Sequence, residues 1–449
     1  ATFVSQTHAE GAGLPAFATR ELEAFLRCGI LAHGFARVHC PACQHERLVA
    51  FACKGRGFCP SCVGKRMTFT AEQLVTRVIP EVPVRQWVLT VPVQLRYRIA
   101  YDHGVCTRVL RTFASALLAS YRKRASELGL PNARCQTGAV TFIQRFGSAL
   151  NLNVHFHTQA LDGVYAEDPS GKLQFHPLPA PTDTQVQDVL EEVAARLARE
   201  LAADADANES EREPLLAACY AGSLTQRAAL GARAGKRPPR IGADPNAPWH
   251  EPRRACHAQL DGFDLHAAVS IPAAARDRLE QLLRYCARPA LSHDRLQKLP
   301  DGRLALTLKT PWHDGTTHIL LTPSELIERL VALVPRPHKN LVVYHGVLAP
   351  NAKWRARITP SPAAQAQPTC AAPTTPPKRT RPNPDWARLM QRAFALDVLD
   401  CPGCGARMRM LALVQETATA RRLLRHLGLR DHPPPIAPSR DHTFEFDAA

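Results

Sequence analysis

The cysteine spacing near the N-terminus is the feature that most constrains the local fold. Two C-x-x-C pairs, fifteen residues apart, lie within residues 40–62. Each pair forms a tight knuckle that directs two thiolates toward one point, and two knuckles can close a tetrahedron around zinc. We therefore predict a structural zinc site with the ligands Cys40, Cys43, Cys59 and Cys62. Cys28 and Cys53 lie nearby, and each is either a ligand in a variant site or a small buried thiol.

A third knuckle occurs near the other end of the chain. Cys401 and Cys404 form the string CPGC. This pair could form a second zinc site, but no second half is evident in the sequence. His426 and His432 follow it, and their spacing is poor for a zinc ligand pair.

The charge balance indicates a polyanionic partner. The chain has 449 residues and a formal net charge of +16, with 45% hydrophobic residues, so it can bury sizeable cores while keeping a basic surface. Such a surface is typical of proteins that bind nucleic acid or an acidic membrane. Paired cysteines without an export signal favour metal binding in a reducing cytoplasm over disulfides. We find no apolar run of the length that spans a bilayer.

Composition and periodicity divide the chain into four parts. We expect an N-terminal helix and zinc-binding module at 1–80, a central domain at 81–358 with a helical insertion at about 185–255, a linker rich in Pro, Ala and Thr at 359–385, and a small C-terminal C-x-x-C module at 386–449.

Within the central part, hydrophobic patterning predicts an alternation of strands and helices. The expected elements are a strand at 85–95, a helix at 104–128, a hairpin with its turn at Gly147 and Ser148, a strand at 262–270, a helix at about 272–287 and short strands within 303–321.

The second strand of that hairpin, with the string NLNVHFHTQ, has an unusual polar face. Its apolar residues alternate with Asn153, His155, His157 and Gln159, and successive side chains of a strand point to opposite faces. Two imidazoles at i and i+2 therefore point the same way and lie close enough to share a cation. A lone strand histidine is usually a satisfied polar residue; this pair is a candidate metal site.

A third ligand should come from a neighbouring strand. With a turn at Gly147–Leu150, Gln144 would sit opposite Asn153 and face the same side as the imidazoles, one diagonal step away. Gln144 is therefore the candidate third ligand, although a slip of one residue in register would turn it to the other face. Asp162 and Asn153 are the alternatives.

One tyrosine stands out by its context. Tyr285 lies at the edge of the apolar stripe of the helix expected at 272–287, so its ring could pack while its hydroxyl stays free. Basic side chains that could hold a phosphate surround it, namely Arg284, Arg288, Arg295 and Lys298. Periodicity alone favours a packing tyrosine.

These features occur in an order that resembles a known family. The strings WVLTVP, QRFGSALNLNVHFH, LLRYCARPALSHDRL and VVYHGVLAPNAKWRARI, with CKGRGFCPSC before and CPGCGARM after them, resemble the HUH superfamily of single-strand nucleases. Within it, the chain is most similar to rolling-circle transposases of the insertion-sequence 91 family. The resemblance runs from about residue 20 to about residue 410.

The resemblance implies a fold and a chemistry. The fold would be α+β, with an antiparallel HUH sheet and flanking helices similar to an RNA-recognition fold. His155 and His157 would bind catalytic Mg²⁺ or Mn²⁺, with zinc as a separate structural ion, and Tyr285 would attack DNA to leave a 5′-phosphotyrosine. Several relatives have two tyrosines four residues apart, whereas Gln281 and Pro289 occupy those offsets here. A single tyrosine must then either act twice or rely on the second subunit of a homodimer.

Two other functions fit the same residues. The chemistry could serve plasmid replication or conjugative transfer, although no GxxxxGK[ST] phosphate loop occurs. Alternatively, the chain is a zinc-ribbon DNA-binding protein without catalysis. We expect single-stranded or extruded DNA as partner, no membrane, and a bacterial cytoplasm at the nucleoid as the location.

Overall fold

The structure is a computed structural model of the chain. It describes residues 13–130, 134–202, 213–244, 246–247, 255–360, 390–392 and 397–434, together with residues 3, 4 and 7. The linker expected at 359–385 therefore lies almost entirely outside the described residues.

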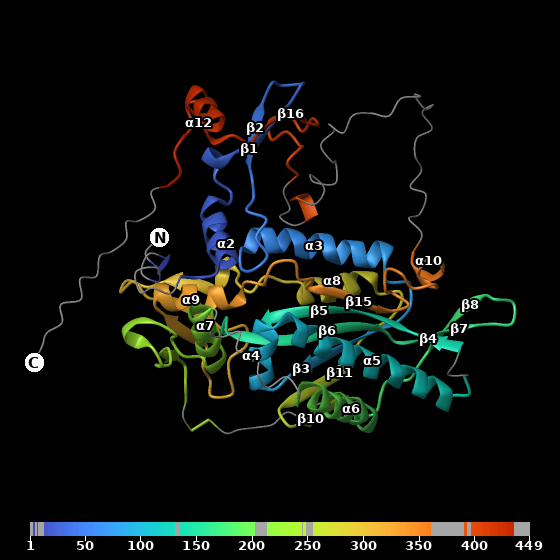
Figure 1. The fold of residues 1–449 in the computed structure, drawn as a ribbon. Helices are drawn as coiled ribbons and strands as arrows, with labels where there is room; N and C mark the ends of the chain where they lie inside the picture. The colour runs from blue at the N-terminus through green and yellow to red at the C-terminus, as the bar shows by residue number, and fades with distance from the viewer. Residues whose placement is uncertain are drawn as a thin grey trace, which may run out of the picture.

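A six-stranded antiparallel sheet forms the centre of the molecule (Figure 1). In spatial order its strands are β10 (His257–Leu260), β11 (Phe263–Ile271), β3 (Val84–Thr90), β6 (Leu152–Leu161), β5 (Gly138–Phe146) and β15 (Val342–Gly346). Two adjacent strands, β5 and β6, form the hairpin that the sequence predicted. Its turn follows Gly147, whose amide donates to the carbonyl of Asn151.

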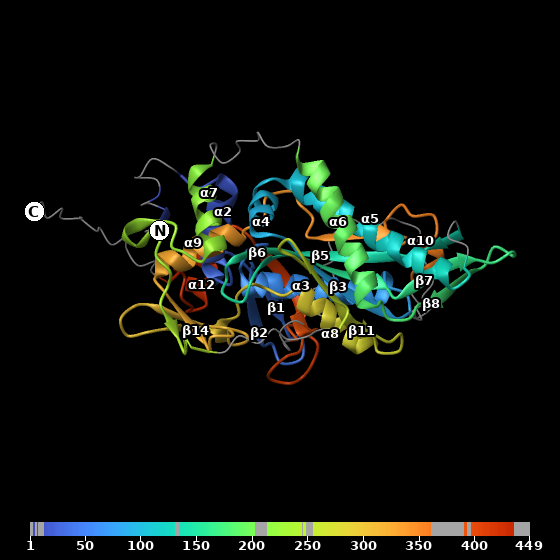
Figure 2. The ribbon, with the colours of Figure 1, turned by 90° about the horizontal axis from the view of Figure 1, so that it is seen from below.

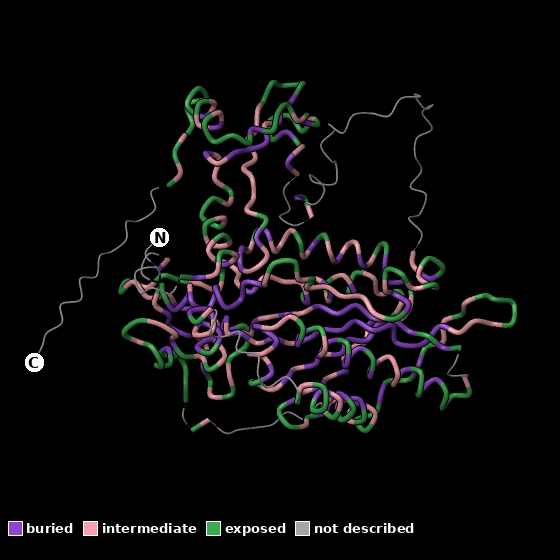
Figure 3. The backbone as a smooth tube through the Cα atoms, viewed as in Figure 1, coloured by how far each residue is buried: buried purple, intermediate pink, exposed green. Residues whose placement is uncertain are grey.

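Helices cover both faces of this sheet. On one side lie α3 (Pro60–Arg77) and α8 (Arg276–Cys286), which pack against each other; on the other lie α4 (Val93–Tyr101), α5 (His103–Glu127) and α6 (Asp183–Ala202). Figure 2, seen from below, shows α5 and α6 side by side in front of the strands. Each face has its own apolar core, and Figure 3 shows the buried strands between them.

Smaller sheets and helices surround this centre. One sheet contains β12 (Leu296–Lys298), β13 (Leu304–Thr307), β14 (His318–Leu321) and β9 (Arg240–Ile241), and another contains β4 (Cys135–Gln136), β7 (Gly163–Glu167) and β8 (Leu173–Pro177). Two packed helices, α7 (Pro214–Thr225) and α9 (Pro323–Leu333), lie near the start of β6, and α10 spans Arg355–Ile358.

The zinc-binding region projects from one side of the molecule (Figure 1). It contains α2 (Ala16–Arg27) and a three-stranded sheet of β16 (Arg409–Val414), β1 (Phe35–His39) and β2 (Glu46–Ala50), with α12 (Thr417–His426) beside it. Residues 35–39 pair with residues 409–414 in antiparallel register. The C-terminal residues that we expected to form a module of their own therefore share a sheet with the N-terminal region.

The predicted α+β class is confirmed, and most expected elements of the central part are present. The strand expected at 85–95 is wrong at its end, because β3 stops at Thr90 and Val93 begins α4. Pro92 precedes that helix with an extended backbone, and its ring fixes φ at a value suited to a helix start. No helix among the described residues combines the length and apolar content that crossing a membrane requires.

Candidate functional site

The polar face of β6 lies beneath α8. The intervening residues Leu152, Val154 and Phe156 are fully buried in the core on the α5 side. On the opposite face, Gln159 donates to the Sγ atom of Cys286 in α8 over 3.3 Å. The alternation read from the sequence thus separates a core face from a face that carries the histidines.

The two imidazoles lie side by side. The ring centroids of His155 and His157 are 4.8 Å apart. The Nδ1 atom of His155 lies 2.7 Å from the carbonyl oxygen of Asn153; because a carbonyl only accepts, Nδ1 carries the proton and Nε2 keeps its lone pair. His157 is buried, and neither of its ring nitrogens has a hydrogen-bond partner among the described residues. Both rings can offer a nitrogen to a cation.

Burial also keeps these rings neutral. It lowers the pKa of His155 to about 4. Burial, followed by the charge of the neighbouring His155, lowers the pKa of His157 to about 3. Neutral imidazole is the form that binds metal, so neither ring needs to lose a proton near pH 7 before it can act as a ligand.

Tyr285 of α8 meets this pair. Its ring centroid lies 5.9 Å from that of His157, with the two ring planes at 87°. The tyrosine is 38% exposed, so it lies at the surface while its ring contacts the imidazole. The sequence placed Tyr285 at the edge of the apolar stripe of its helix, and the structure agrees.

Two cations cover the tyrosine ring. The guanidinium of Arg288 lies 4.6 Å from the ring centroid, and the Nζ atom of Lys309 lies 4.2 Å from it. Lys309 was missed by the sequence reasoning. It lies in the connection between β13 and β14, and nothing in its local sequence indicates that this connection reaches α8. Both cations could attract a phosphate toward the tyrosine.

Gln144 lies on the correct face of the sheet but in a different register from the one expected. It pairs with His155, two residues further along β6 than the expected partner Asn153, and the hairpin ladder is irregular between Gln144 and Phe146. Directly opposite residues point to the same face, so Gln144 faces the same side as the imidazoles. Its amide nitrogen donates to the carbonyl oxygen of Cys286 over 3.1 Å, and its carbonyl oxygen is the atom that could bind a cation.

The alternative ligand Asp162 is excluded by its partners. Its carboxylate forms a buried ion pair of 2.8 Å with Arg85 and accepts hydrogen bonds from Tyr121 and Ser270. It follows the far end of β6 from the imidazoles. The other alternative, Asn153, has a buried side-chain oxygen without a partner among the described residues.

The cysteines group differently from the prediction. Cys28, Cys53, Cys59 and Cys62 form one cluster, and Cys40, Cys43, Cys401 and Cys404 form another; within each, the sulfur atoms lie within 4.8 Å of one another. The predicted single site from the knuckles at 40–43 and 59–62 is therefore wrong. The antiparallel pairing of β1 with β16 brings the knuckle at 401–404 to the one at 40–43, so each knuckle closes with other partners.

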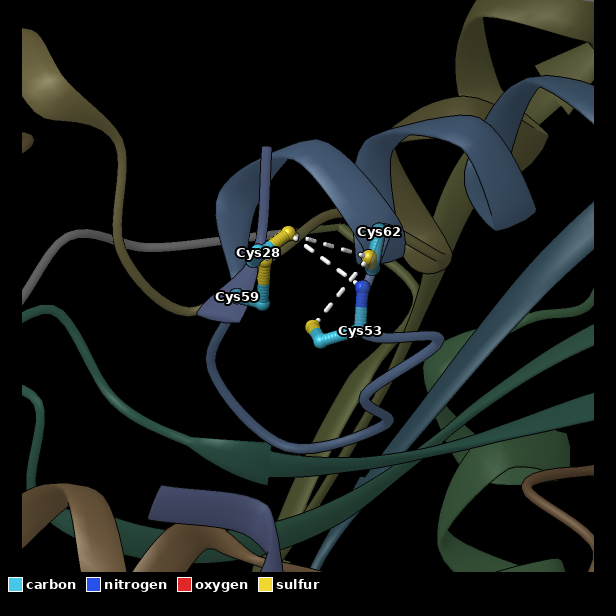
Figure 4. Close-up of side chains that lie close together, drawn as sticks. All are labelled: Cys28, Cys53, Cys59 and Cys62. Atoms are coloured by element: carbon cyan, nitrogen blue, oxygen red, sulfur yellow. Dashed lines mark hydrogen bonds between the residues drawn. The ribbon is translucent and has the colours of Figure 1, made fainter. Parts of the chain in front are cut away.

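The first cluster joins the end of α2 to the start of α3 (Figure 4). Cys28 follows α2, and its sulfur lies 3.7 Å from that of Cys59 and 3.8 Å from that of Cys62. The sulfur atoms of Cys53 and Cys62 are 3.3 Å apart. Zn–S bonds of about 2.3 Å in a tetrahedron put sulfurs about 3.8 Å apart, so the geometry fits zinc. Cys28 and Cys53 are members of this cluster, which answers the alternative left open by the sequence.

The second cluster has similar geometry. Sulfur–sulfur distances are 3.5 Å between Cys40 and Cys404 and 3.4 Å between Cys43 and Cys401.

Each cluster also contains a thiol that ionises easily. A hydrogen bond from Cys59 lowers the pKa of Cys62 to about 4, and a backbone hydrogen bond from Cys43 lowers that of Cys40 to about 6. Thiolates are the form that binds zinc.

Comparisons with known families identify the chain. Residues 138–355 match a family model described as "Putative transposase", and residues 2–91 match one described as "Transposase zinc-binding domain", the zinc-binding domain of insertion-sequence 91 transposases. The chain belongs to the insertion-sequence 91 family of transposases. Neither the curated proteins nor the solved structures gave a match.

The matched ranges divide the site of this transposase in an informative way. The transposase range holds the imidazole pair, Gln144 and Tyr285, and the zinc-binding range holds the whole first cysteine cluster. Cys401 and Cys404 lie outside both ranges. A transposase acts on DNA, so DNA is its partner, and its cysteine clusters and zinc-binding domain support structural zinc.

The four basic residues predicted to bind DNA are not equivalent in the transposase. Only Arg288 contacts the tyrosine ring. Arg284 turns toward α3, where it donates to Thr68. Arg295 donates to the carbonyl oxygens of Ser148 and Thr307. Lys298 is exposed on β12. DNA binding by these four residues stays a prediction.

Proposed function

We propose that the transposase nicks and rejoins single-stranded DNA, as in rolling-circle transposition, with Tyr285 as the nucleophile. The observation that carries this proposal is the contact between Tyr285 and His157, whose ring centroids are 5.9 Å apart. A phosphate held at the imidazoles would be within reach of the phenol, because both rings belong to one surface formed by β6 and α8.

The donor set supports a divalent cation at this site. His155 and His157 would each supply a neutral nitrogen, and Gln144 would supply its amide oxygen; the remaining positions would be filled by water and by the DNA phosphate. Mg²⁺ and Mn²⁺ prefer oxygen ligands, so phosphate binding would complete the site. When bound, such an ion polarises the phosphate and stabilises the charge that develops on it.

The residues of the chain then account for the transfer itself. The phenolic oxygen of Tyr285 attacks the phosphorus and its proton leaves to solvent, while the bond from phosphorus to the 3′-oxygen breaks and that oxygen takes up a proton. The products are a 5′-phosphotyrosine and a free 3′-hydroxyl. Arg288 and Lys309, which lie over the tyrosine ring, would hold the phosphate during the attack. The bond energy is kept in the covalent link, so rejoining needs no nucleotide cofactor.

Because α8 contains only one tyrosine, we propose that either Tyr285 acts twice in succession or two subunits each contribute one. On this proposal the protein works in the bacterial cytoplasm, at the nucleoid. Mixing wild-type with Tyr285→Phe protein and measuring strand rejoining distinguishes these two routes, since a dimer that needs both tyrosines loses activity in proportion to the mixed dimers formed.

Labelled single-stranded oligonucleotides, with the sequences that flank the transposable element, test the proposal. With Mn²⁺ present, wild-type protein should form a covalent adduct that survives denaturation. Tyr285→Phe should abolish the adduct but keep single-strand binding, whereas Tyr344→Phe, a change of the same size on β15, should keep both. An adduct formed by Tyr285→Phe would refute the assignment, and binding without any wild-type adduct would favour a non-catalytic DNA-binding protein.

A further inference from the structure

A cavity lies beside the imidazole pair, on the same face of the central sheet. Its walls come from the start of α3 and the loop before it, from β5, from the end of α8 and from residues 333–342. Its volume is about 90 Å³. Because one buried water needs about 10–15 Å³, the cavity has room for about as many atoms as a pyrimidine base has.

The lining combines a charge with an apolar interior. Four of the described residues that line the cavity are arginines and none is acidic. Arg66 is exposed on α3, whereas the Nε atom of Arg288 is buried and has no partner among the described residues. Between them lie apolar groups, including Phe146, Pro335 and Val342. Burial, and then the charge of Arg66, lower the pKa of Arg56, so these cations crowd one another and an anion would relieve the repulsion.

Arg288 connects this cavity to the nucleophile. Its guanidinium lies 5.4 Å from the ring centroid of Phe146 and 4.6 Å from that of Tyr285. Gln144, which faces the imidazoles' side of the sheet, also lines the cavity. A DNA strand with one phosphate at Tyr285 would therefore have its neighbouring nucleotide at the mouth of the cavity.

The first cysteine cluster holds one wall of this cavity. Arg56 and Gly57 lie in the loop between Cys53 and Cys59. The amide of Gly57 donates to Glu21 in α2, and the guanidinium of Arg56 donates to the carbonyl oxygen of Lys339. Closing the cluster thus fixes the loop that presents Arg56 to the cavity.

We infer that the cavity binds one nucleotide of the cleaved strand, next to the scissile phosphate. Its base would lie against Phe146 and Pro335 and its phosphate on Arg66, while Arg288 would lie between this nucleotide and the scissile phosphate. This inference rests on the proposed function for the position of the scissile phosphate. It makes the zinc-binding module a direct part of strand binding at the catalytic centre, because one wall of the nucleotide site belongs to it.

Photo-crosslinking tests the inference on the full-length protein. In the flanking-sequence oligonucleotides, each thymidine in turn is replaced by 4-thiothymidine, and the crosslinked peptide is identified by mass spectrometry. A position next to the cleaved phosphate should crosslink to Phe146 or to residues 333–342. Thr70→Trp, which fills the cavity from α3 without changing charge, should reduce that crosslink at least tenfold. Leu128→Trp, an exposed position at the end of α5, should leave it unchanged.

The outcomes separate this inference from the nuclease proposal. Tyr285→Phe should keep the crosslink while it loses the covalent adduct. If wild-type protein forms the adduct at Tyr285 but the neighbouring nucleotide crosslinks elsewhere, or if Thr70→Trp crosslinks like wild type, the cavity is not a nucleotide site and the nuclease proposal stands. If the cavity crosslinks but no adduct forms, the nuclease proposal fails and the cavity remains a nucleotide site.

The phosphate contact has a test of its own. Replacing Arg66 with Gln should lower the slope of log binding constant against log salt concentration by about one, because one fewer phosphate is neutralised. Arg77→Gln, an exposed arginine at the C-terminal end of the same helix, is the matched control and should change the slope less. Equal slopes for Arg66→Gln and wild type would remove Arg66 from the nucleotide site.

Discussion

At the scale of single residues, the chemistry depends on which side chains remain without partners. Asp162 and His157 are both buried on strand β6 or directly after it, yet Asp162 is satisfied by Arg85 and Tyr121 whereas the ring nitrogens of His157 have no partner among the described residues. A buried polar group without a hydrogen-bond partner lowers the stability of the fold. Such groups are typical of sites that bind a ligand or an ion. The same contrast distinguishes a structural carboxylate from an imidazole whose nitrogens are free to bind a ligand.

Glu328 provides a pH test at this scale. Burial raises the pKa of this carboxyl group to about 7, and its side chain accepts a hydrogen bond from the amide of Ala229 over 2.8 Å. The folded-state pKa lies above the unfolded value, so the stabilisation is present at low pH and is lost as pH rises through about 7. Between pH 5 and pH 8 we expect wild type to lose about 2 kcal/mol of unfolding free energy relative to Glu328→Gln.

Urea unfolding of both proteins at the two pH values measures this difference. The glutamine can still accept from the Ala229 amide, so the comparison isolates the proton. Parallel pH dependence in the two proteins would show that Glu328 is ionised in the folded state throughout this range and would contradict the expectation.

At the scale of elements, α9 positions the hairpin that carries the histidines. Arg329 of this helix donates to the carbonyl oxygen of Ala149 in the turn between β5 and β6. The helix begins with a capping box, in which Thr322 accepts from the amide of Glu325 and the Glu325 side chain accepts from the amide of Thr322. The capping box therefore stabilises the start of the same helix whose Arg329 holds the hairpin turn.

Removing that cap gives a prediction for the element. Thr322→Ala leaves the Glu325 amide without its side-chain acceptor and should lower the unfolding free energy by about 1 kcal/mol. Thr322→Ser keeps the hydroxyl and should stay within a few tenths of a kcal/mol of wild type. Chemical denaturation of the three proteins measures both effects; a loss in the serine variant equal to that in the alanine variant would mean that the methyl group, not the cap, matters.

The elements also show how far local sequence determines structure. The alternation around His155 and His157 predicted the correct strand and faces, because a period of two needs no information from elsewhere in the chain. The stripe that placed Tyr285 at a helix edge was equally local. The end of β3 was misjudged because VPVQL is apolar enough to continue a strand, whereas Pro92 starts a helix there. The register of Gln144 depended on the length of the hairpin turn, which closes between Gly147 and Asn151, and on an irregularity of the ladder; spacing reveals neither.

At the scale of the whole molecule, the two cysteine clusters show that the spacing of cysteines does not identify which of them share a site. The knuckle at 40–43 lies only fifteen residues before the one at 59–62, but its partner is more than 350 residues away in the chain. Two thiols in a C-x-x-C pair do not indicate which other pair completes their site. Only the pairing of β1 with β16 brings the two ends together. Lys309 was missed for the same reason, since its contact with Tyr285 joins distant segments.

This arrangement predicts two zinc ions per chain. The double variant Cys401→Ser, Cys404→Ser should bind one, because the first cluster is intact, and Cys28→Ser with Cys53→Ser should also bind one. Elemental analysis of the purified proteins gives the number of zinc ions per chain, and circular dichroism checks that each variant is folded. If wild-type protein binds one zinc ion and both double variants still bind one, the result would instead support a single site formed by Cys40, Cys43, Cys59 and Cys62.

The central claim is that Tyr285 and the imidazole pair act on one DNA phosphate. The most direct measurement is to isolate the covalent adduct formed with single-stranded DNA and Mn²⁺, digest it with trypsin and sequence the DNA-linked peptide. Cleavage after Arg284, with the bond before Pro289 resistant, gives YCARPALSHDR, residues 285–295, which contains one tyrosine. We expect the nucleotides on this peptide, and no adduct from His157→Ala protein. Nucleotides on a peptide that contains any other tyrosine, or an adduct that forms equally well without His157, would contradict the claim.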